Sequence, residues 1–198
     1  LKEYTQIIIN EADRLQNLMN RMLTPHQMPV YKRTNIHEIL ERVRSLILSE
    51  FTSDINFIRD YDVSLPEFIV DREKLIQAIL NIARNGAQAM KLNNQNNMQL
   101  SFITRAERQI VFRKKKHATA IRIDIIDNGP GIKNELIDKI FFPLVTGNEN
   151  GSGLGLSLAQ NLISLHQGMI DCHSVPGKTV FSIILPIENN LVPTKEKK

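Results

Sequence analysis

Two glycine-rich segments constrain the fold of this chain more than any other feature. The first is Asp127-Asn128-Gly129-Pro130-Gly131, and the second is Gly151-Ser152-Gly153-Leu154-Gly155-Leu156. Glycine lacks a Cβ and accepts positive φ, so such segments let the backbone turn tightly and approach a polyphosphate. The second segment leads into a predicted helix, and a helix N-terminus favours anions. Together they predict a nucleotide site, whereas either one alone could be an ordinary strand-to-helix turn.

A pair of asparagines precedes these segments on a predicted helix. Asn81 and Asn85 are four residues apart, so they share one helix face. Asparagine is unfavourable inside a helix because its side chain competes for backbone hydrogen bonds. Amide oxygens suit Mg²⁺, which completes its shell with water and phosphate oxygens. The alternative is ordinary hydrogen bonding to neighbouring backbone. The carboxylate of Asp127 could in turn accept a hydrogen bond from the amino group of a base.

Several other classes of site are excluded by the residues present. The glycine spacing is not that of the dinucleotide fingerprint, and no Gly-Lys-Ser/Thr of a P-loop occurs. Cys172 is the only cysteine, so an intrachain disulfide and a cysteine-based metal site are impossible, and we expect a small buried hydrophobe there. We expect all five histidines to be structural or exposed, namely His26, His37, His117, His166 and His173.

Composition narrows the possible partners. The formal net charge of +4 is concentrated in residues 113–116 and 195–198, which predicts solvated basic patches and no nucleic-acid partner. No apolar run has the length of a membrane span, and no signal peptide opens the chain, so a cytoplasmic protein with no membrane partner is the expectation. Leu1 lies within an amphipathic pattern, which suggests a fragment of a longer protein.

Hydrophobic periodicity predicts the elements. An amphipathic helix over residues 4–23 precedes a proline-containing linker. Asn35 and Asp71 are predicted N-caps, the first in a capping box with Glu38. Residues 144–150 are predicted to be a mobile lid, and residues 188–198 a disordered tail. The remaining predicted helices cover about 36–50, 72–90, 134–140 and 153–167, and the strands 30–35, 55–61, 68–70, 98–104, two within 108–126, 169–173 and 179–185.

These residues resemble the sensor histidine kinases. Asn81-Ile82-Ala83-Arg84-Asn85 is similar to their N box, the two glycine segments to their glycine boxes, and Phe141-Phe142-Pro143 to their F box. Gly177-Lys178-Thr179 with Phe181 resembles the closing segment. The match covers about residues 30–187. It implies the Bergerat ATP-binding fold shared with gyrase, Hsp90 and MutL, an α+β two-layer sandwich with helices on one face of a mixed sheet.

The resemblance is closer still to the nitrogen-regulation members of that family, through residues 4–15, 58–66 and the basic insert before Ile121. It implies that residues 1–24 are the second helix of a dimerisation and phosphoacceptor hairpin and that residues 25–29 are a linker. The phosphoacceptor histidine would then lie outside this chain, which would be inactive alone. The implied partners are a response regulator of the NtrC type, a PII-type signal protein and a second copy in the full-length protein.

Carried over by position, the resemblance assigns ATP and Mg²⁺ as cofactors. Asn85 would be the metal ligand, Asp127 would bind the adenine amino group, and Arg84 would face the phosphoacceptor helix. Gly86 departs from the family, which usually has alanine there. No residue of this chain is expected to be catalytic. The full set expected to bind the nucleotide is Asn81, Asn85, Asp127, Gly129, Gly131, Gly151, Gly153, Leu154, Gly155 and Thr179.

Two alternatives remain at this point. An ATPase of the same fold would need a glutamate general base beside the N-box asparagine, but Arg84 and Gly86 flank Asn85. The second alternative is a nucleotide-dependent interaction module, which only binds a partner.

Overall fold

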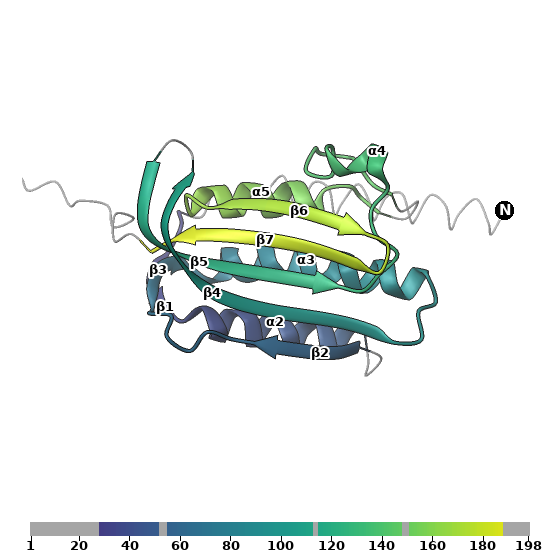
Figure 1. Ribbon diagram of the computed structural model, residues 1–198, viewed down its shortest axis with the longest axis horizontal. Helices are drawn as coiled ribbons and strands as arrows, with labels where there is room; N and C mark the ends of the chain where they lie inside the picture. Colours follow the sequence, from purple (N-terminus) through teal and green to yellow (C-terminus); the bar gives the residue numbers. More distant parts are fainter. Residues whose placement is uncertain (1–27, 52–54, 113–114, 148–150, 188–198) are drawn as a thin grey trace, which may run out of the picture.

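A mixed β-sheet carries its helices on one face, as the sequence predicts (Figure 1). The computed structural model describes residues 28–51, 55–112, 115–147 and 151–187. The helix predicted over residues 4–23, the tail over 188–198 and His26 lie outside the described residues, as does most of the predicted linker. Within the described ranges, no helix is both long and apolar enough to cross a bilayer.

Five strands form the main sheet, in the order β2-β4-β5-β7-β6. Only β2 and β4 pair in parallel, and the other neighbours are antiparallel. Ile121, Ile123 and Ile125 of β5 are buried, while Arg122 and Asp124 between them are half-buried on the other face, as the predicted alternation requires. The strands are β2 (Ile55–Asp60), β4 (Met98–Phe112), β5 (Lys115–Asp127), β6 (Met169–Val175) and β7 (Lys178–Pro186).

A second, two-stranded sheet leads into the helices. Strand β1 (Tyr31–Thr34) pairs antiparallel with β3 (Phe68–Asp71), and each is followed directly by a long helix. Helix α2 (Ile36–Glu50) follows β1, and α3 (Arg72–Leu92) follows β3. The Asp71 carboxylate caps α3 by accepting from the Lys74 amide, as predicted. The other helices in the described ranges are the short helix α4 (Asn134–Ile137) and helix α5 (Gly155–Leu165).

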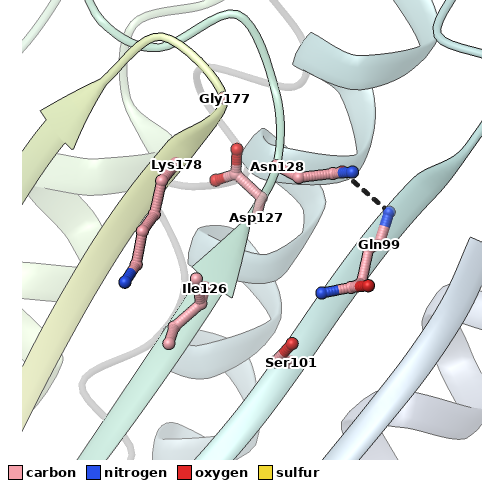
Figure 2. A pocket seen from close by; sticks show the side chains of 7 residues that line it. All are labelled: Gln99, Ser101, Ile126, Asp127, Asn128, Gly177 and Lys178. Carbon is pink, nitrogen blue, oxygen red and sulfur yellow. Dashed lines mark hydrogen bonds between the residues drawn. The ribbon is translucent and has the colours of Figure 1, made fainter.

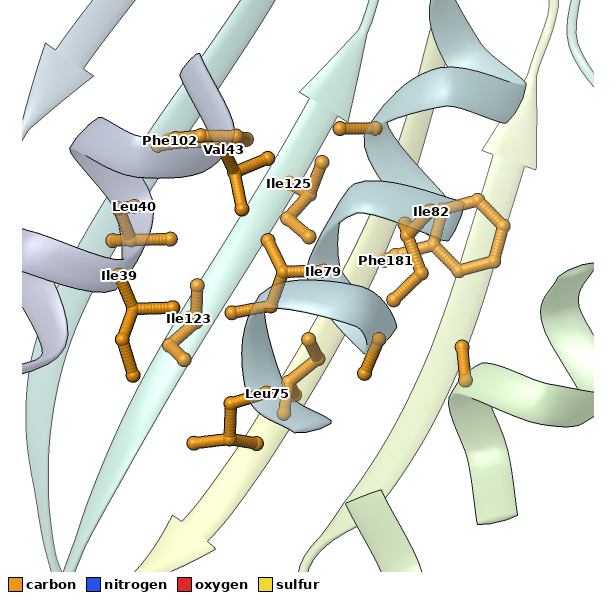
Figure 3. Packing of buried hydrophobic residues seen from close by; sticks show 14 of the residues in the cluster. Ile39, Leu40, Val43, Leu75, Ile79, Ile82, Phe102, Ile123, Ile125 and Phe181 are labelled. Carbon is orange, nitrogen blue, oxygen red and sulfur yellow. The ribbon is translucent and has the colours of Figure 1, made fainter. Parts of the chain in front are cut away.

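The core lies between the helices and the sheet (Figure 3). Apolar side chains of α2 and α3 meet those of the central strands, and burial of such surface is the main favourable term in folding. This packing holds α3 against the sheet, so the residues at the ends of β5 and β7 have defined positions relative to that helix. The labelled core residues are Ile39, Leu40, Val43, Leu75, Ile79, Ile82, Phe102, Ile123, Ile125 and Phe181.

One predicted break in a strand is wrong because tertiary contacts override local preference. Strand β4 is continuous from Met98 to Phe112, whereas the sequence predicted a break after residue 104. Pairing of Arg105 with Arg122 and of Glu107 with Ala120 in β5 carries the strand through this polar stretch. The Glu107 carboxylate also accepts a hydrogen bond from Arg122 at 2.7 Å.

Three details of the helices also differ from the predictions. The Asn35 side chain caps α2 by accepting from the amide of His37, not that of Glu38. Helix α5 begins at Gly155 rather than Gly153, because Gly153 has φ of +65°, outside the helical region. Helix α4 ends at Ile137, before the predicted end at residue 140.

Candidate functional site

The buried carboxylate of Asp127 stands at the end of β5. Its side chain faces α3, and its Oδ1 accepts a hydrogen bond from the Gly129 amide at 2.9 Å. Burial raises the pKa of Asp127, and hydrogen bonds from the Gly129 amide and the Thr179 hydroxyl partly offset that rise. The structure thus provides a fixed, poorly solvated acceptor, which suits one directional hydrogen bond from a ligand.

Close contacts surround this carboxylate. A Cβ built on Gly86 of α3 would lie 2.9 Å from Asp127 Oδ2, and one on Gly129 would lie 2.8 Å from Oδ1. Thr179 of β7 pairs directly with Asp127, and its hydroxyl oxygen is 2.9 Å from that of Ser174 in β6. The contributions of Gly86 and Ser174 were not predicted. No local pattern marks Ser174, because strand pairing alone brings it there.

The first glycine box is fastened to the turn between β6 and β7. The Gly177 amide donates to the Gly129 carbonyl at 2.9 Å. Gly131 has φ of +83°, and a Cβ there would lie 2.9 Å from the Val175 carbonyl oxygen. The two strands are joined by a turn at Pro176-Gly177. The glycines of this box therefore allow close approach of protein segments to one another, in addition to any approach by a ligand.

Asn81 and Asn85 face the beginning of α5. A Cβ on Gly155 would lie 3.8 Å from Asn85 Oδ1 and 4.0 Å from Asn81 Cβ. Both asparagines are half-buried, and neither carboxamide hydrogen-bonds to any residue in the described ranges. The alternative of ordinary hydrogen bonds to neighbouring backbone is therefore not what the structure contains. The Asn85 carboxamide lies beside Gly155, the first residue of α5, and the Asn81 side chain begins next to it.

The N-terminus of α5 has no side-chain cap. Leu154 occupies the N-cap position, and the Ser157 hydroxyl donates to the Leu154 carbonyl instead of capping an amide. The side chain of the N-cap residue therefore satisfies none of the first amides of the helix, and the helix dipole favours an anion there. Gly151, where the described segment begins, and Leu154 are both half-buried.

Gly153 packs on the segment that follows the F box. A Cβ on Gly153 would lie 2.5 Å from the Leu144 carbonyl carbon, and the Leu144 amide donates to the Gly153 carbonyl at 3.0 Å. Leu144 itself has φ of +66°, although it is not glycine. The first residue of the predicted lid is therefore hydrogen-bonded to Gly153, which lies beyond the lid's predicted end at residue 150. Residues 148–150 lie outside the described ranges.

Asn128 of the first glycine box serves the opposite face of the sheet. Its Oδ1 accepts from the Gln99 amide at 2.8 Å (Figure 2). Its Nδ2 donates to the Asn97 carbonyl. Successive side chains on a strand alternate faces, so Asn128 points away from the Asp127 carboxylate. A shallow hollow of about 260 Å³ lies at this end of the sheet, lined by Gln99, Ser101, Ile126, Asp127, Asn128, Gly177 and Lys178.

Cys172 and Arg84 remain among the residues that the sequence singles out, and the helix that Arg84 is expected to face lies outside the described residues. Cys172 is half-buried beside Phe181, and burial, with the charges of Asp171 and Asp127, raises the pKa of its thiol to about 12. A thiol of this kind is not an active nucleophile at neutral pH. The Arg84 guanidinium pairs with the Glu50 carboxylate at 2.8 Å.

Four histidines lie in the described ranges. His117 and His166 are buried, and His37 is half-buried in a hydrogen bond with Thr104, while His173 is exposed. These four agree with the expectation that the histidines are structural or exposed.

Comparison with known proteins shows which family model and which proteins the chain resembles in sequence. Residues 70–189 match the family model described as histidine kinase-, DNA gyrase B-, and HSP90-like ATPase. The chain is 47% identical over 187 residues to the sensory histidine kinase/phosphatase NtrB of Vibrio alginolyticus, covering 94% of this chain and 53% of that protein. It is 35% identical to NtrB of Rhodobacter capsulatus, covering 93% and 52%. The chain thus spans about half the length of these relatives.

Solved structures share the fold. The mycobacterial sensor histidine kinase MprB superposes with a TM-score of 0.64 at 21% identity, covering 78% of this chain and 97% of that one. The histidine kinase ThkA, solved with the response regulator protein TrrA, gives a TM-score of 0.65 at 24% identity, covering 95% and 52%. At these identities the likeness concerns the fold alone, and it agrees with the predicted α+β sandwich.

Proposed function

This chain belongs to the family of histidine kinase-, DNA gyrase B- and HSP90-like ATPases, and we therefore propose that it is the ATP-binding catalytic part of a nitrogen-regulation sensor histidine kinase. Similarity to NtrB over nearly the whole chain supports the narrower assignment. In this proposal the chain binds ATP with Mg²⁺. The γ-phosphoryl group passes to a histidine outside this chain and then to a response-regulator aspartate.

One observation carries the proposal. The carboxamides of Asn81 and Asn85 have no partner among the described residues, and both adjoin Gly155 at the uncapped start of α5. Amide oxygens and an anion-binding helix end are what a Mg²⁺–polyphosphate requires. Asn85 would bind the metal, with Asn81 near the phosphates. Gly151, Gly153, Leu154 and Gly155 would receive the phosphates.

The part of the site around Asp127 suits a purine base. Asp127 would accept a hydrogen bond from the adenine amino group, with Thr179 beside it. Gly129 and Gly131 shape the turn that holds the carboxylate in place. Gly86, which contacts Asp127, follows Asn85 directly, so the proposed contacts to the base and to the metal come from adjacent residues of α3.

Phosphoryl transfer needs positioning and charge neutralisation more than covalent participation by the protein. The bond between the γ-phosphorus and the bridging oxygen of ATP breaks, a bond from phosphorus to an imidazole nitrogen forms, and ADP leaves. The imidazole proton passes to a base that this chain is not expected to supply. The proposed partners are a response regulator of the NtrC type, a PII-type signal protein and, for the whole protein, a second copy of itself.

The surroundings of Asn85 favour transfer over hydrolysis. An ATPase of this fold would need a glutamate next to that asparagine to activate water. The flanking residues are Arg84, which is paired with Glu50, and Gly86, which has no side chain. The described part of α3 thus offers no acid at that position.

Two measurements test the proposal. Calorimetry with Mg²⁺ and a non-hydrolysable ATP analogue should show saturable binding. A separately supplied phosphoacceptor hairpin from an NtrB relative should then be phosphorylated by the chain with ATP. Absence of nucleotide binding would overturn the proposal. Multiple-turnover ATP hydrolysis without transfer to the hairpin would replace it with the ATPase alternative.

A further inference from the structure

A buried histidine joins the two helices of the site at the end remote from the nucleotide. His166 is 2% exposed, at the C-cap of α5. Its Nε2 accepts a hydrogen bond from the backbone amide of Asp71 at 3.0 Å, and its Nδ1 is 2.8 Å from the Leu162 carbonyl oxygen. An amide can only donate, so Nε2 carries no proton and Nδ1–H donates to Leu162. Both ring nitrogens are satisfied by the neutral tautomer.

This contact lies where several segments converge. Asp71 is the N-cap of α3, and its carboxylate also accepts from the Val30 amide at 3.0 Å. The Tyr31 ring meets the His166 ring edge-on, with centroids 5.9 Å apart. His166 therefore connects the end of α5, the start of α3 and the beginning of β1. A buried side chain with these contacts cannot move without breaking at least one of them.

Helices α3 and α5 run antiparallel along each other. The start of α3 is bonded to the end of α5 through His166, and the start of α5 faces Asn81 and Asn85 farther along α3. With a rise of about 1.5 Å per residue, the two contacts are about 16 Å apart. A slip of one helical turn would move the asparagines by about 5.4 Å relative to Gly155.

Among the buried residues of α5 that the structure describes, only His166 hydrogen-bonds across to the N-cap of α3. Its buried residues besides His166 are Ser157, Ala159, Leu162 and Ile163, and Ser157 bonds within its own helix. Apolar attraction is itself non-directional, so the apolar contacts of α5 set its register only through the fit of their side chains. The hydrogen bond from Asp71 to His166 is directional.

We propose that His166 is a positioning residue for the nucleotide site: it fixes the register of α5 against α3 and so places the phosphate-binding turn opposite Asn81 and Asn85. This inference rests on the proposed ATP-binding function. The base contacts at Asp127, Gly86 and Gly129 involve α3 and β5 but not α5. Loss of His166 should therefore weaken the binding of phosphates more than the binding of the base.

The test compares Mg²⁺–ATP with adenosine on the whole chain. In His166→Leu the Asp71 amide loses its acceptor, and affinity for Mg²⁺–ATP should fall about tenfold while affinity for adenosine changes less than about twofold. His166→Gln can place Oε1 near the position of Nε2, so it should restore the ratio of the two affinities. If His166→Leu does not fold, His166→Asn replaces it, since Asn can bond Leu162 but does not reach Asp71.

A second histidine provides the matched control. His37 is half-buried on α2, bonded to Thr104 and stacked on Tyr61, away from α5. His37→Leu should lower thermal stability and leave the ratio of affinities unchanged. Equal loss of both ligands in the His166 variants, or no recovery with glutamine, would overturn the positioning role. If the native chain binds neither ligand, the proposed function fails, and this inference fails with it.

Discussion

Gly86 of α3 and Asp127 of β5 are in such close contact that a Cβ on the glycine would lie 2.9 Å from Asp127 Oδ2. Glycine inside a helix costs about 1 kcal/mol relative to alanine. Here it gives the carboxylate room to lie against the helix that also carries Asn85. The two groups proposed to bind the base and the metal are therefore separated by helix backbone, which is stiffer than a loop.

Asp127→Asn should abolish most nucleotide binding without destabilising the fold. Because burial raises the pKa of Asp127, the native state holds this proton more tightly than the unfolded state, and the ionised carboxylate destabilises the fold at neutral pH. Asparagine removes that charge but can present an NH₂ group to the adenine amino group. We expect ATP affinity to fall at least about tenfold and Tm at pH 7 to stay level or rise. A lower Tm together with unchanged affinity would contradict both parts.

Asn85→Ala should remove the Mg²⁺-dependent part of ATP binding. Its carboxamide has no partner in the described ranges, so its loss should leave Tm nearly unchanged. Calorimetry with and without Mg²⁺ should show a loss of at least about tenfold only when the metal is present. Asn161→Ala is the control, since Asn161 is exposed on α5. A metal-independent loss would assign Asn85 to the nucleotide rather than to Mg²⁺.

Alanine substitutions at two glycines with positive φ should distinguish the cost of backbone strain from the cost of a steric clash. Gly153 and Gly177 have φ of +65° and +85°, but a Cβ on Gly153 would lie 2.5 Å from the Leu144 carbonyl carbon, whereas one on Gly177 would meet nothing within 4 Å. Gly177→Ala should cost only the strain of about 1–2 kcal/mol. Gly153→Ala should cost more, or displace the segment at Leu144, and weaken ATP binding. Equal unfolding free energies and equal affinities for the two variants would contradict this.

Stability should fall as pH falls below neutral. Burial lowers the pKa of His166, although the Leu162 carbonyl and the Asp71 carboxylate oppose this and Lys74 adds to it. The unfolded state, with an ordinary pKa of about 6.5, therefore binds the proton more readily. The stability that comes from keeping His166 neutral is complete above the pKa of the unfolded state, and it is lost as the pH falls through that pKa.

Thermal unfolding at several pH values measures this effect. Besides Asp71 and Lys74, the group facing the ring is Tyr31, whose pKa is raised by burial and by Asp71, so it stays neutral across this range. The Tm of the native chain should drop between about pH 7.5 and 5.5, and the drop should be smaller in His166→Gln. His37, whose pKa burial also lowers, adds a drop common to both proteins. Identical pH profiles would exclude His166 as a source.

Much of the fold could be predicted from local pattern. Helices α2 and α3, with their caps at Asn35 and Asp71, follow from hydrophobic periodicity and from side chains that bond the first free amides. The continuity of β4 through residues 105–107 could not be predicted, because the strand there depends on its partner β5. The start of α5 was misjudged because the positive φ of Gly153 could not be predicted from hydrophobic periodicity, and α4 ends at Ile137, earlier than that periodicity indicated.

The sequence by itself determined which groups this protein can offer: two asparagines one turn apart on one helix face, an aspartate after a strand, and glycines that permit tight turns. These follow from the periods of helix and strand and from the chemistry of each side chain. Only the tertiary structure decided that Gly155 faces Asn81 and Asn85, that Gly86 makes room for Asp127, and that His166 bonds the first residue before α3. Those contacts join residues far apart in the chain, and the packing of helices on the sheet sets them.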